Sequence, residues 1–154
     1  MAIKVERESI WLDFPGTARE EIIQNICFKL KDIGKTDDPS GLYHDIMERE
    51  GLVSTFAGHD TAIPHVVTNH INSPALCFIR VADPDLTWHG NSENVTFVVF
   101  SAVPKGEAAA TIRAEQSQIF GALALLIRTP DVTSVWKVAE DAEVIQKSLN
   151  FTLS

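Results

Sequence analysis

"PALCFIRVADPDLTWHGNSENVTFVVFSAV" (residues 74–103) contains the two apolar runs that decide the expected fold. "PALCFIRVA" and "NVTFVVFSAV" are rich in β-branched and aromatic residues and lie between Pro, Asp and Asn residues, a composition typical of strands. The shorter run "TAIPH" (residues 61–65) has the same character, and "DPDLTWHGN" (residues 83–91) is interpreted as a loop with room for a short strand. The middle of the chain is therefore expected to form a sheet.

Helical periodicity lies on both sides of these strands. Thr17 and Glu20 have the spacing of a capping box, and apolar residues then recur at helical intervals as far as Gly34. A second helix is expected after "TDDPS" (residues 36–40) and should end near Gly51. A long helix is expected from about residue 107 to residue 128, with shorter ones around 132–139 and 142–149. This order predicts a layered α/β or α+β domain in which helices cover a small sheet.

A proline followed by a histidine interrupts the strand in "HDTAIPHVV" (residues 59–67). Pro64 cannot donate a ladder hydrogen bond and belongs at a strand end or sheet edge, so the ladder is expected to fail at His65. Pro64 also holds Ile63 extended, which presents His65 from a stiff backbone. Two interpretations are open: a reactive imidazole at the margin of the core, or an ordinary surface histidine after a strand.

Composition narrows the classes of function. The chain has 154 residues, 45% of them hydrophobic, which predicts one domain over residues 1–154. The formal net charge of −8, with no run of basic residues, argues against nucleic acid as a partner. The longest apolar runs are too short for membrane insertion, and the charged N-terminus lacks a signal core, so a cytoplasmic location is expected. Cys27 and Cys77 lie in apolar patterns and are expected to be buried free thiols.

Several chemical motifs are missing from the sequence. His59, His65 and His70 lack the ligand spacing of zinc sites, so no metal is expected. There is no GxSxG elbow of a serine hydrolase, and neither GxGxxG nor GxxxxGK[ST] occurs to hold a nucleotide. We therefore expect no cofactor.

Two polar features have both a structural and a functional interpretation. Gln116 falls on the apolar face of the long predicted helix, four residues after Ile112 and four before Phe120. It is either a polar residue satisfied by backbone or water, or an amide aimed into a site. Arg49 leads from a helix into a loop with Ser54 and Thr55, and these donors suit an anionic ligand, although most such arginines are solvated.

Taken in order, these motifs resemble those of a known family. The stretch "ERE-GLVST…TAIPH", followed by "QSQIFGALALLIRTPDV", is similar to enzyme IIA of the fructose/mannitol superfamily of the bacterial sugar phosphotransferase system. The matching positions of the first stretch are Arg49, Glu50, Thr55, Ile63, Pro64 and His65. The resemblance covers nearly the whole chain. It implies a three-layer α/β fold, with a central mixed and mostly parallel sheet flanked by helices, as a single type-2 enzyme IIA domain spanning residues 1–154.

The same resemblance implies a phosphotransferase with a phosphohistidine intermediate. His65 would accept a phosphoryl group from the phosphocarrier HPr and pass it to an enzyme IIB, which serves sugar uptake through a membrane enzyme IIC. Imidazole is a nucleophile near neutral pH, and the transfer needs no metal or nucleotide on this chain. Arg49 would be the charged donor to the phosphoryl oxygens, with Thr55 and Ser54 contributing hydroxyl or N–H groups.

Two departures from the family pattern affect the details. Gln116 stands where many members have a second histidine, which makes the galactitol-type branch the nearest resemblance. Phe56 follows Thr55 where the family often has glycine, so a different loop shape is expected. Two further functions stay open: a regulatory protein controlled through phosphorylation of the same histidine, and a binding module that has lost phosphoryl transfer. The sugar itself stays undetermined.

Overall fold

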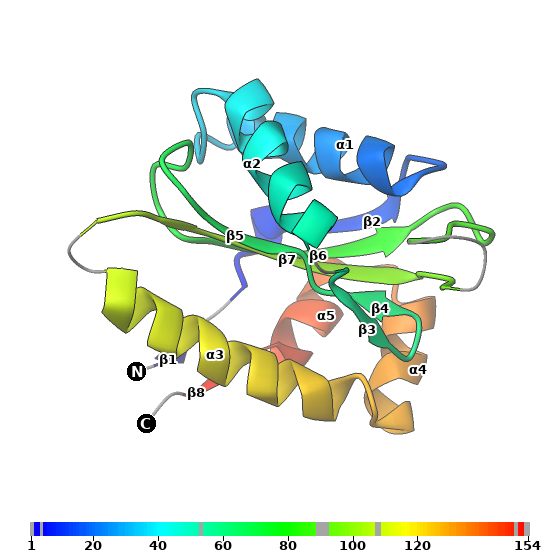
Figure 1. Cartoon of the computed structure of the whole chain (residues 1–154). Helices are drawn as coiled ribbons and strands as arrows, with labels where there is room; N and C mark the ends of the chain where they lie inside the picture. The colour runs from blue at the N-terminus through cyan, green and yellow to red at the C-terminus, as the bar shows by residue number, and fades with distance from the viewer. Residues whose placement is uncertain are drawn as a thin grey trace.

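The chain folds into three layers, with a mixed β-sheet between two layers of helices (Figure 1). The computed structural model describes residues 2–3, 5–52, 54–88, 93–106, 109–149 and 151–152. Helices α1 (Arg19–Asp32) and α2 (Pro39–Leu52) cover one face of the sheet. The other face carries α3 (Ala109–Leu126), α4 (Pro130–Val138) and α5 (Ala142–Ser148). The expected three-layer α/β fold is confirmed.

The strands of the main sheet run in the order β2-β6-β7-β4-β3, with β5 also pairing to β7. Their bounds are β2 Ile10–Phe14, β3 Phe56–Gly58, β4 Thr61–Ala62, β5 His65–Thr68, β6 Ala75–Val81 and β7 Phe97–Pro104. The pairs β2·β6, β4·β7 and β5·β7 are parallel, whereas β6·β7 and β3·β4 are antiparallel. A short 3-10 helix, Arg7–Ser9, precedes β2, and β1 (Ala2–Ile3) pairs with β8 (Phe151–Thr152) in a separate antiparallel sheet.

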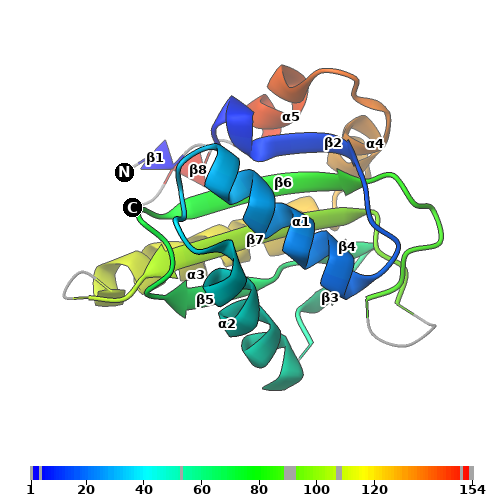
Figure 2. The same cartoon turned by 90° about the horizontal axis from the view of Figure 1, so that it is seen from above.

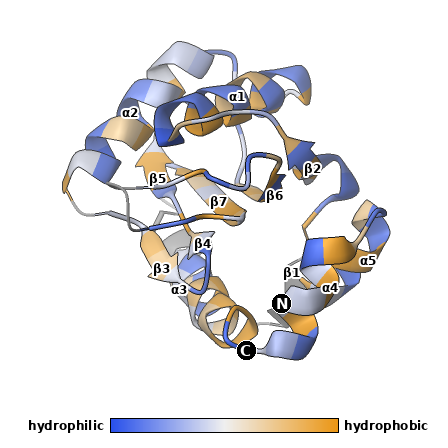
Figure 3. Ribbon diagram, turned by 90° about the vertical axis from the view of Figure 1, so that its right-hand side faces the viewer, coloured by the Kyte–Doolittle hydropathy of each residue, from blue (hydrophilic) through white to orange (hydrophobic). Residues whose placement is uncertain are grey.

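Strand β7 lies at the centre and is buried on both faces, which explains its continuous apolar sequence. Val98 and Phe100 face α1 and α2, while Phe97 and Val99 face the C-terminal helices. Figure 2 shows α1 and α2 lying over the strands. In Figure 3, the hydrophobic positions of α1 lie on its sheet-facing side, as the helical repeat of its buried residues requires.

The break in the strand before His65 corrects one expectation. Pairing is interrupted at Ile63 and Pro64, and His65 is the first residue of β5 rather than the residue where the ladder fails. The strands β4 and β5 keep the same residue offset from β7, so they continue one line beside it. Pro64 lacks an N–H, but its carbonyl accepts from the Ser101 N–H at 3.0 Å and keeps the chain attached to β7.

The start of α1 also differs from the expectation. Ala18 occupies the N-cap position, and no side chain caps it. The Glu21 carboxylate instead accepts from the Thr17 N–H at 2.7 Å, so the expected pairing of Thr17 with Glu20 is wrong by one residue.

The strands β1, β2, β3 and β8 were not predicted, because each gains its order from a partner strand and not from local pattern. The α-helices and the strands β4, β6 and β7 agree with the expectation, whereas the 3-10 helix and β5 do not. Thr87 forms an isolated bridge with Asn94 in the predicted loop. Residues 107–108, where the long helix was expected to begin, lie outside the described residues, as does the side chain of Ile112.

Candidate functional site

His65 lies half-buried at the start of β5, with a different partner on each ring nitrogen. Nδ1 is 2.9 Å from the carbonyl oxygen of Ile63. A carbonyl only accepts, so Nδ1 carries the proton and donates, and Nε2 of the neutral ring keeps its lone pair. The ring packs against Phe120 of α3, with centroids 4.7 Å apart. The local backbone thereby selects one tautomer and presents Nε2 as the nucleophilic atom.

Arg49 approaches this same nitrogen from the last turn of α2. Its terminal nitrogen lies 3.3 Å from Nε2 of His65, and because a guanidinium only donates, Nε2 accepts. The two residues line a pocket of about 370 Å³, together with Leu52 and Lys105 and with the carboxylates of Asp45 and Glu48. A fixed cation beside an accessible nucleophile suits a tetrahedral anion, because the guanidinium offers several donors to oxygen atoms. The structure thus brings together the sequence-predicted His65 and Arg49.

Thr55 and Ser54 use their hydroxyls within the loop itself. The Thr55 hydroxyl donates to the buried Glu50 carboxylate, and the Thr55 N–H lies 3.4 Å from the other carboxylate oxygen. The Ser54 hydroxyl accepts from the Phe56 N–H at 3.2 Å. Neither residue lines the pocket around His65. Direct hydroxyl contact with a phosphoryl group therefore stays a prediction, and the structure gives Thr55 a different partner.

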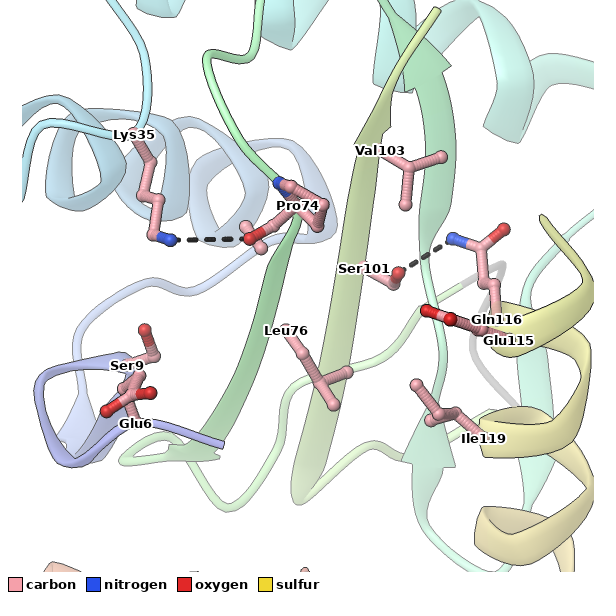
Figure 4. A pocket seen from close by; sticks show the side chains of 11 residues that line it. Glu6, Ser9, Lys35, Pro74, Leu76, Ser101, Val103, Glu115, Gln116 and Ile119 are labelled. Carbon is pink, nitrogen blue, oxygen red and sulfur yellow. Dashed lines mark hydrogen bonds between the residues drawn. The ribbon is translucent and has the colours of Figure 1, made fainter. Parts of the chain in front are cut away.

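Gln116 is buried on α3 and donates from Nε2 to the Ser101 hydroxyl at 2.7 Å. Its partner is thus a side chain, rather than the backbone or water considered from sequence. Figure 4 shows the amide directed at Ser101, and both residues line a cavity of about 170 Å³ together with Leu76 and Ile119. Ser101 is the ladder partner of His65 between β7 and β5. Gln116 therefore contacts the residue that pairs with the histidine.

Phe56 does not impose strain on its loop. It begins strand β3, and the turn that follows β3 takes its left-handed conformation at Gly58, His59 and Asp60, with φ of 83°, 51° and 60°. Phe56 itself is not among the residues with positive φ, so this position does not need the backbone freedom of glycine, and a loop shape that differs from the family's stays a prediction.

Glu50 is the site residue that sequence reasoning quoted but left without a role. Leu42, Ile46 and Glu50 recur every four residues and are all buried on α2, so the helical repeat itself placed a carboxylate on the buried face. Phe120 is a second such residue, because its position on the apolar face of α3 gave no sign of contact with the His65 ring.

Of the other candidate ligands and nucleophiles, Asp45 and Glu48 line the pocket of His65, whereas His44, His59, His70 and the two cysteines do not. Among the described residues, His44, Asp45 and Glu48 have ligand atoms within 4.8 Å of one another, but His44 and Glu48 are exposed. His59 and His70 do not belong to that group. Cys27 and Cys77 are free and buried as expected, and burial raises the pKa of each thiol to about 12.

No single helix in the described ranges is long and apolar enough to cross a membrane. The bent pair Ala114–Leu126 and Pro130–Val138 meets the length and composition criteria only when its two parts are taken together.

Fold and site together define a layered α/β protein whose unprotonated histidine nitrogen lies beside a guanidinium at a sheet edge. Residues 4–151 match the family described as "Phosphoenolpyruvate-dependent sugar phosphotransferase system, EIIA 2". The chain belongs to this family, which confirms the family resemblance drawn from the sequence.

Curated relatives include much longer proteins as well as one of similar length. Multiphosphoryl transfer protein 1 of Escherichia coli K12 is 26% identical over 147 residues, which cover 96% of this chain and 17% of that protein. The chain thus spans about a sixth of that relative. The fructose-specific EIIA component of the phosphotransferase system of Haloferax volcanii is 27% identical, with 92% of this chain and 89% of that protein covered.

Solved structures share the fold at low sequence identity. The nitrogen regulatory protein IIA-Ntr of Neisseria meningitidis has a TM-score of 0.78 at 18% identity, covering 94% of this chain and 95% of that one. IIA mannitol of Escherichia coli has a TM-score of 0.75 at 18% identity, covering 96% and 99%. A complex of enzyme IIA and phosphorylated enzyme IIB for mannitol, from the same organism, gives a TM-score of 0.74 at 17% identity, covering 95% and 96%.

Proposed function

We propose that this chain is a phosphocarrier of a sugar phosphotransferase system and that Nε2 of His65 carries the phosphoryl group. The observation that supports this assignment is the pair of contacts on the His65 ring. The Ile63 carbonyl holds the proton on Nδ1, and the Arg49 guanidinium lies beside the free lone pair of Nε2. Family membership supports the same chemistry.

The proposed reaction moves one phosphoryl group between two nitrogens. The Nε2 lone pair attacks the phosphorus of phosphohistidine on HPr, the new N–P bond forms at His65, and the N–P bond of the donor breaks. Arg49 then moves its donors from Nε2 to the phosphoryl oxygens, whose charge it neutralises. The ring keeps its Nδ1 proton throughout, because Ile63 continues to accept it. In the second transfer a nucleophile of enzyme IIB attacks the phosphorus, its bond to phosphorus forms, the N–P bond at His65 breaks, and Nε2 regains its lone pair.

The same proposal assigns partners and a location. HPr is the donor, an enzyme IIB is the acceptor, and a membrane enzyme IIC takes part only indirectly. These partners place the chain in the cytoplasm. The mannitol complex that shares the fold joins enzyme IIA to phosphorylated enzyme IIB, as its name states, which supports an enzyme IIB as the acceptor.

The galactitol-type branch stays a prediction that rests on Gln116 alone. The relatives and structures described above name fructose, mannitol and nitrogen regulation, and none of them names galactitol.

Intact-mass spectrometry tests the proposed function. The protein is incubated with phosphoenolpyruvate, enzyme I and HPr, and the His65→Ala variant is treated in parallel. We expect one acid-labile phosphoryl group on the parent and none on the variant. Absence of the group from the parent, while HPr itself is phosphorylated, would refute the proposal and favour a binding module that has lost transfer.

Addition of enzyme IIB separates transport from the regulatory alternative, which uses the same histidine. Loss of the phosphoryl group from the parent to enzyme IIB supports the transport route. A phosphorylated form that no enzyme IIB drains, and that binds a protein outside the transport system, would support regulation.

A further inference from the structure

Glu50 is a buried carboxylate next to the proposed site, and its side chain is 0% exposed. One oxygen accepts from the Thr55 hydroxyl, and the other lies 3.4 Å from the Thr55 N–H and 4.0 Å from a guanidinium nitrogen of Arg19. Burial of a carboxylate is costly unless its oxygens are hydrogen-bonded or paired with a cation. These contacts meet that requirement, and they join the end of α2 to the start of α1 and to the loop before β3.

The loop that Glu50 holds leads to the Nδ1 side of His65. The Thr55 carbonyl accepts from the Ile63 N–H at 2.9 Å, and the Ile63 carbonyl accepts from Nδ1 of His65, also at 2.9 Å. A continuous series of hydrogen bonds therefore runs from the Glu50 carboxylate through Thr55 and Ile63 to the imidazole. Displacement of Thr55 would move the carbonyl that determines the tautomer.

The Nε2 side of the ring depends on the same residue. Arg49 and Glu50 are adjacent in the last turn of α2, and Arg49 contacts Nε2 of His65 at 3.3 Å. The contacts of Glu50 with Thr55 and Arg19 hold this turn against two other segments. A single carboxylate thus supports both groups that contact the ring nitrogens.

We propose that Glu50 is a positioning residue for His65: through Thr55 and Ile63 it keeps the proton on Nδ1, and through the last turn of α2 it keeps Arg49 at Nε2. This inference rests on the proposed phosphoryl transfer and extends it to a residue that touches neither the ring nor the phosphoryl group. It also gives Thr55 a role that differs from direct contact with the phosphoryl oxygens.

The test uses four variants in two matched pairs. Glu50→Gln keeps the shape of the side chain but replaces one of its two acceptor oxygens with an NH₂ group. That group then faces either the N–H or the hydroxyl of Thr55, and neither can donate to it. Its control is Glu20→Gln, which removes the exposed carboxylate that contacts Arg19 at 2.9 Å. Thr55→Val removes the hydroxyl that Glu50 accepts, and Thr55→Ser restores it.

The first readout is the tautomer of His65, which does not depend on phosphorylation. Long-range ¹H–¹⁵N spectra of the imidazoles, recorded at about pH 8.5 where an ordinary histidine is neutral, distinguish Nδ1–H from Nε2–H. The His65→Ala spectrum assigns the signal. We expect a loss of Nδ1–H population in Glu50→Gln and in Thr55→Val, with parental spectra for Thr55→Ser and Glu20→Gln.

The second readout is the rate of phosphoryl transfer from HPr, which we expect to fall about 10- to 100-fold in Glu50→Gln and Thr55→Val. A parental tautomer in both variants would overturn the inference, and if Glu50→Gln does not fold, Thr55→Val decides alone. If the tautomer changes but the parent accepts no phosphoryl group, the positioning of the ring stands and the proposed function fails.

Discussion

The two nitrogens of His65 differ because one faces a carbonyl and the other faces a guanidinium. This asymmetry is a property of single atoms, and it determines which nitrogen is free to form a bond. Arg49 is the charged group that lies against the ring, with a terminal nitrogen 3.3 Å from Nε2. Its expected contribution to phosphoryl transfer is to charge and orientation at Nε2.

Substitution Arg49→Ala should slow phosphoryl transfer by about 100-fold, the order found when a fixed donor to a developing oxyanion is removed. Arg49→Lys should restore only part of the rate, because an ammonium cannot make the paired donor contacts of a guanidinium. Quench-flow measurement of transfer from phospho-HPr checks both rates, and circular dichroism checks the fold. Parental rates in Arg49→Ala would mean that the donor role belongs elsewhere.

Gln116 offers a second prediction at the scale of one residue. A histidine at this position retains a ring N–H that can reach the Ser101 hydroxyl, so Gln116→His should fold and transfer phosphate at the parental rate or faster. The exposed Gln118 on the same helix supplies a control, Gln118→His. A variant that no longer unfolds cooperatively in urea would indicate that Gln116 is a packed structural residue.

Helix α4 shows how one element is attached to the rest of the fold. Trp136 is fully buried and lies edge-on to Phe78 and Phe97, with ring centroids 5.1 and 5.4 Å away. Its Nε1 donates to the Ser148 hydroxyl at 2.8 Å, which links α4 to α5. Arg80 of β6 donates to the Trp136 carbonyl at 3.1 Å and so binds the C-terminal end of α4.

Replacement of this anchor should therefore be costly. Trp136→Ala is expected to lower the free energy of unfolding by about 3–5 kcal/mol, because a large buried side chain leaves a cavity. Val138→Ala on the same helix, where the side chain is 76% exposed, should change it by less than about 0.5 kcal/mol. Urea unfolding followed by fluorescence and circular dichroism measures both. Equal effects of the two substitutions would contradict the anchoring role of Trp136.

The whole molecule buries two apolar cores, one on each face of the sheet, and the first contains both thiols. Cys27 and Cys77 have pKa values raised to about 12 by burial, from an ordinary value of 9.0. The folded state therefore keeps the two thiol protons at a pH where the unfolded chain loses them. The stability contributed by the protonated thiols is complete below about pH 9 and is lost as the pH rises toward about 12.

This linkage predicts the pH dependence of unfolding. Between about pH 9 and 12, each thiol should contribute a decrease of at most about 1.4 kcal/mol per pH unit to the free energy of unfolding. The double substitution Cys27→Ala and Cys77→Ala should remove the part of the slope that the two thiols contribute. Urea titrations of parent and variant at several alkaline pH values measure the difference between their slopes of unfolding free energy against pH. Identical slopes would mean that the folded protein exposes these thiols.

Local pattern alone determined the types and order of most elements, because helical and strand periodicity are properties of neighbouring residues. The apolar runs at 74–82 and 94–103 did become β6 and β7, and the histidine after Ile-Pro and the arginine at the end of α2 did meet. What the sequence could not supply was which long-range partner each segment takes, as the unpredicted strand β2 shows.

Tertiary structure decided the finer chemistry of the site. It placed the Gln116 amide on Ser101, directed the Thr55 hydroxyl to Glu50, and started a new strand at His65 instead of ending one there. Each outcome depends on a group far along the chain or on competition between several acceptors for one donor. Distances in the folded state determine which hydrogen-bond partner each group takes, whereas the sequence alone already shows which residues carry the donors and acceptors.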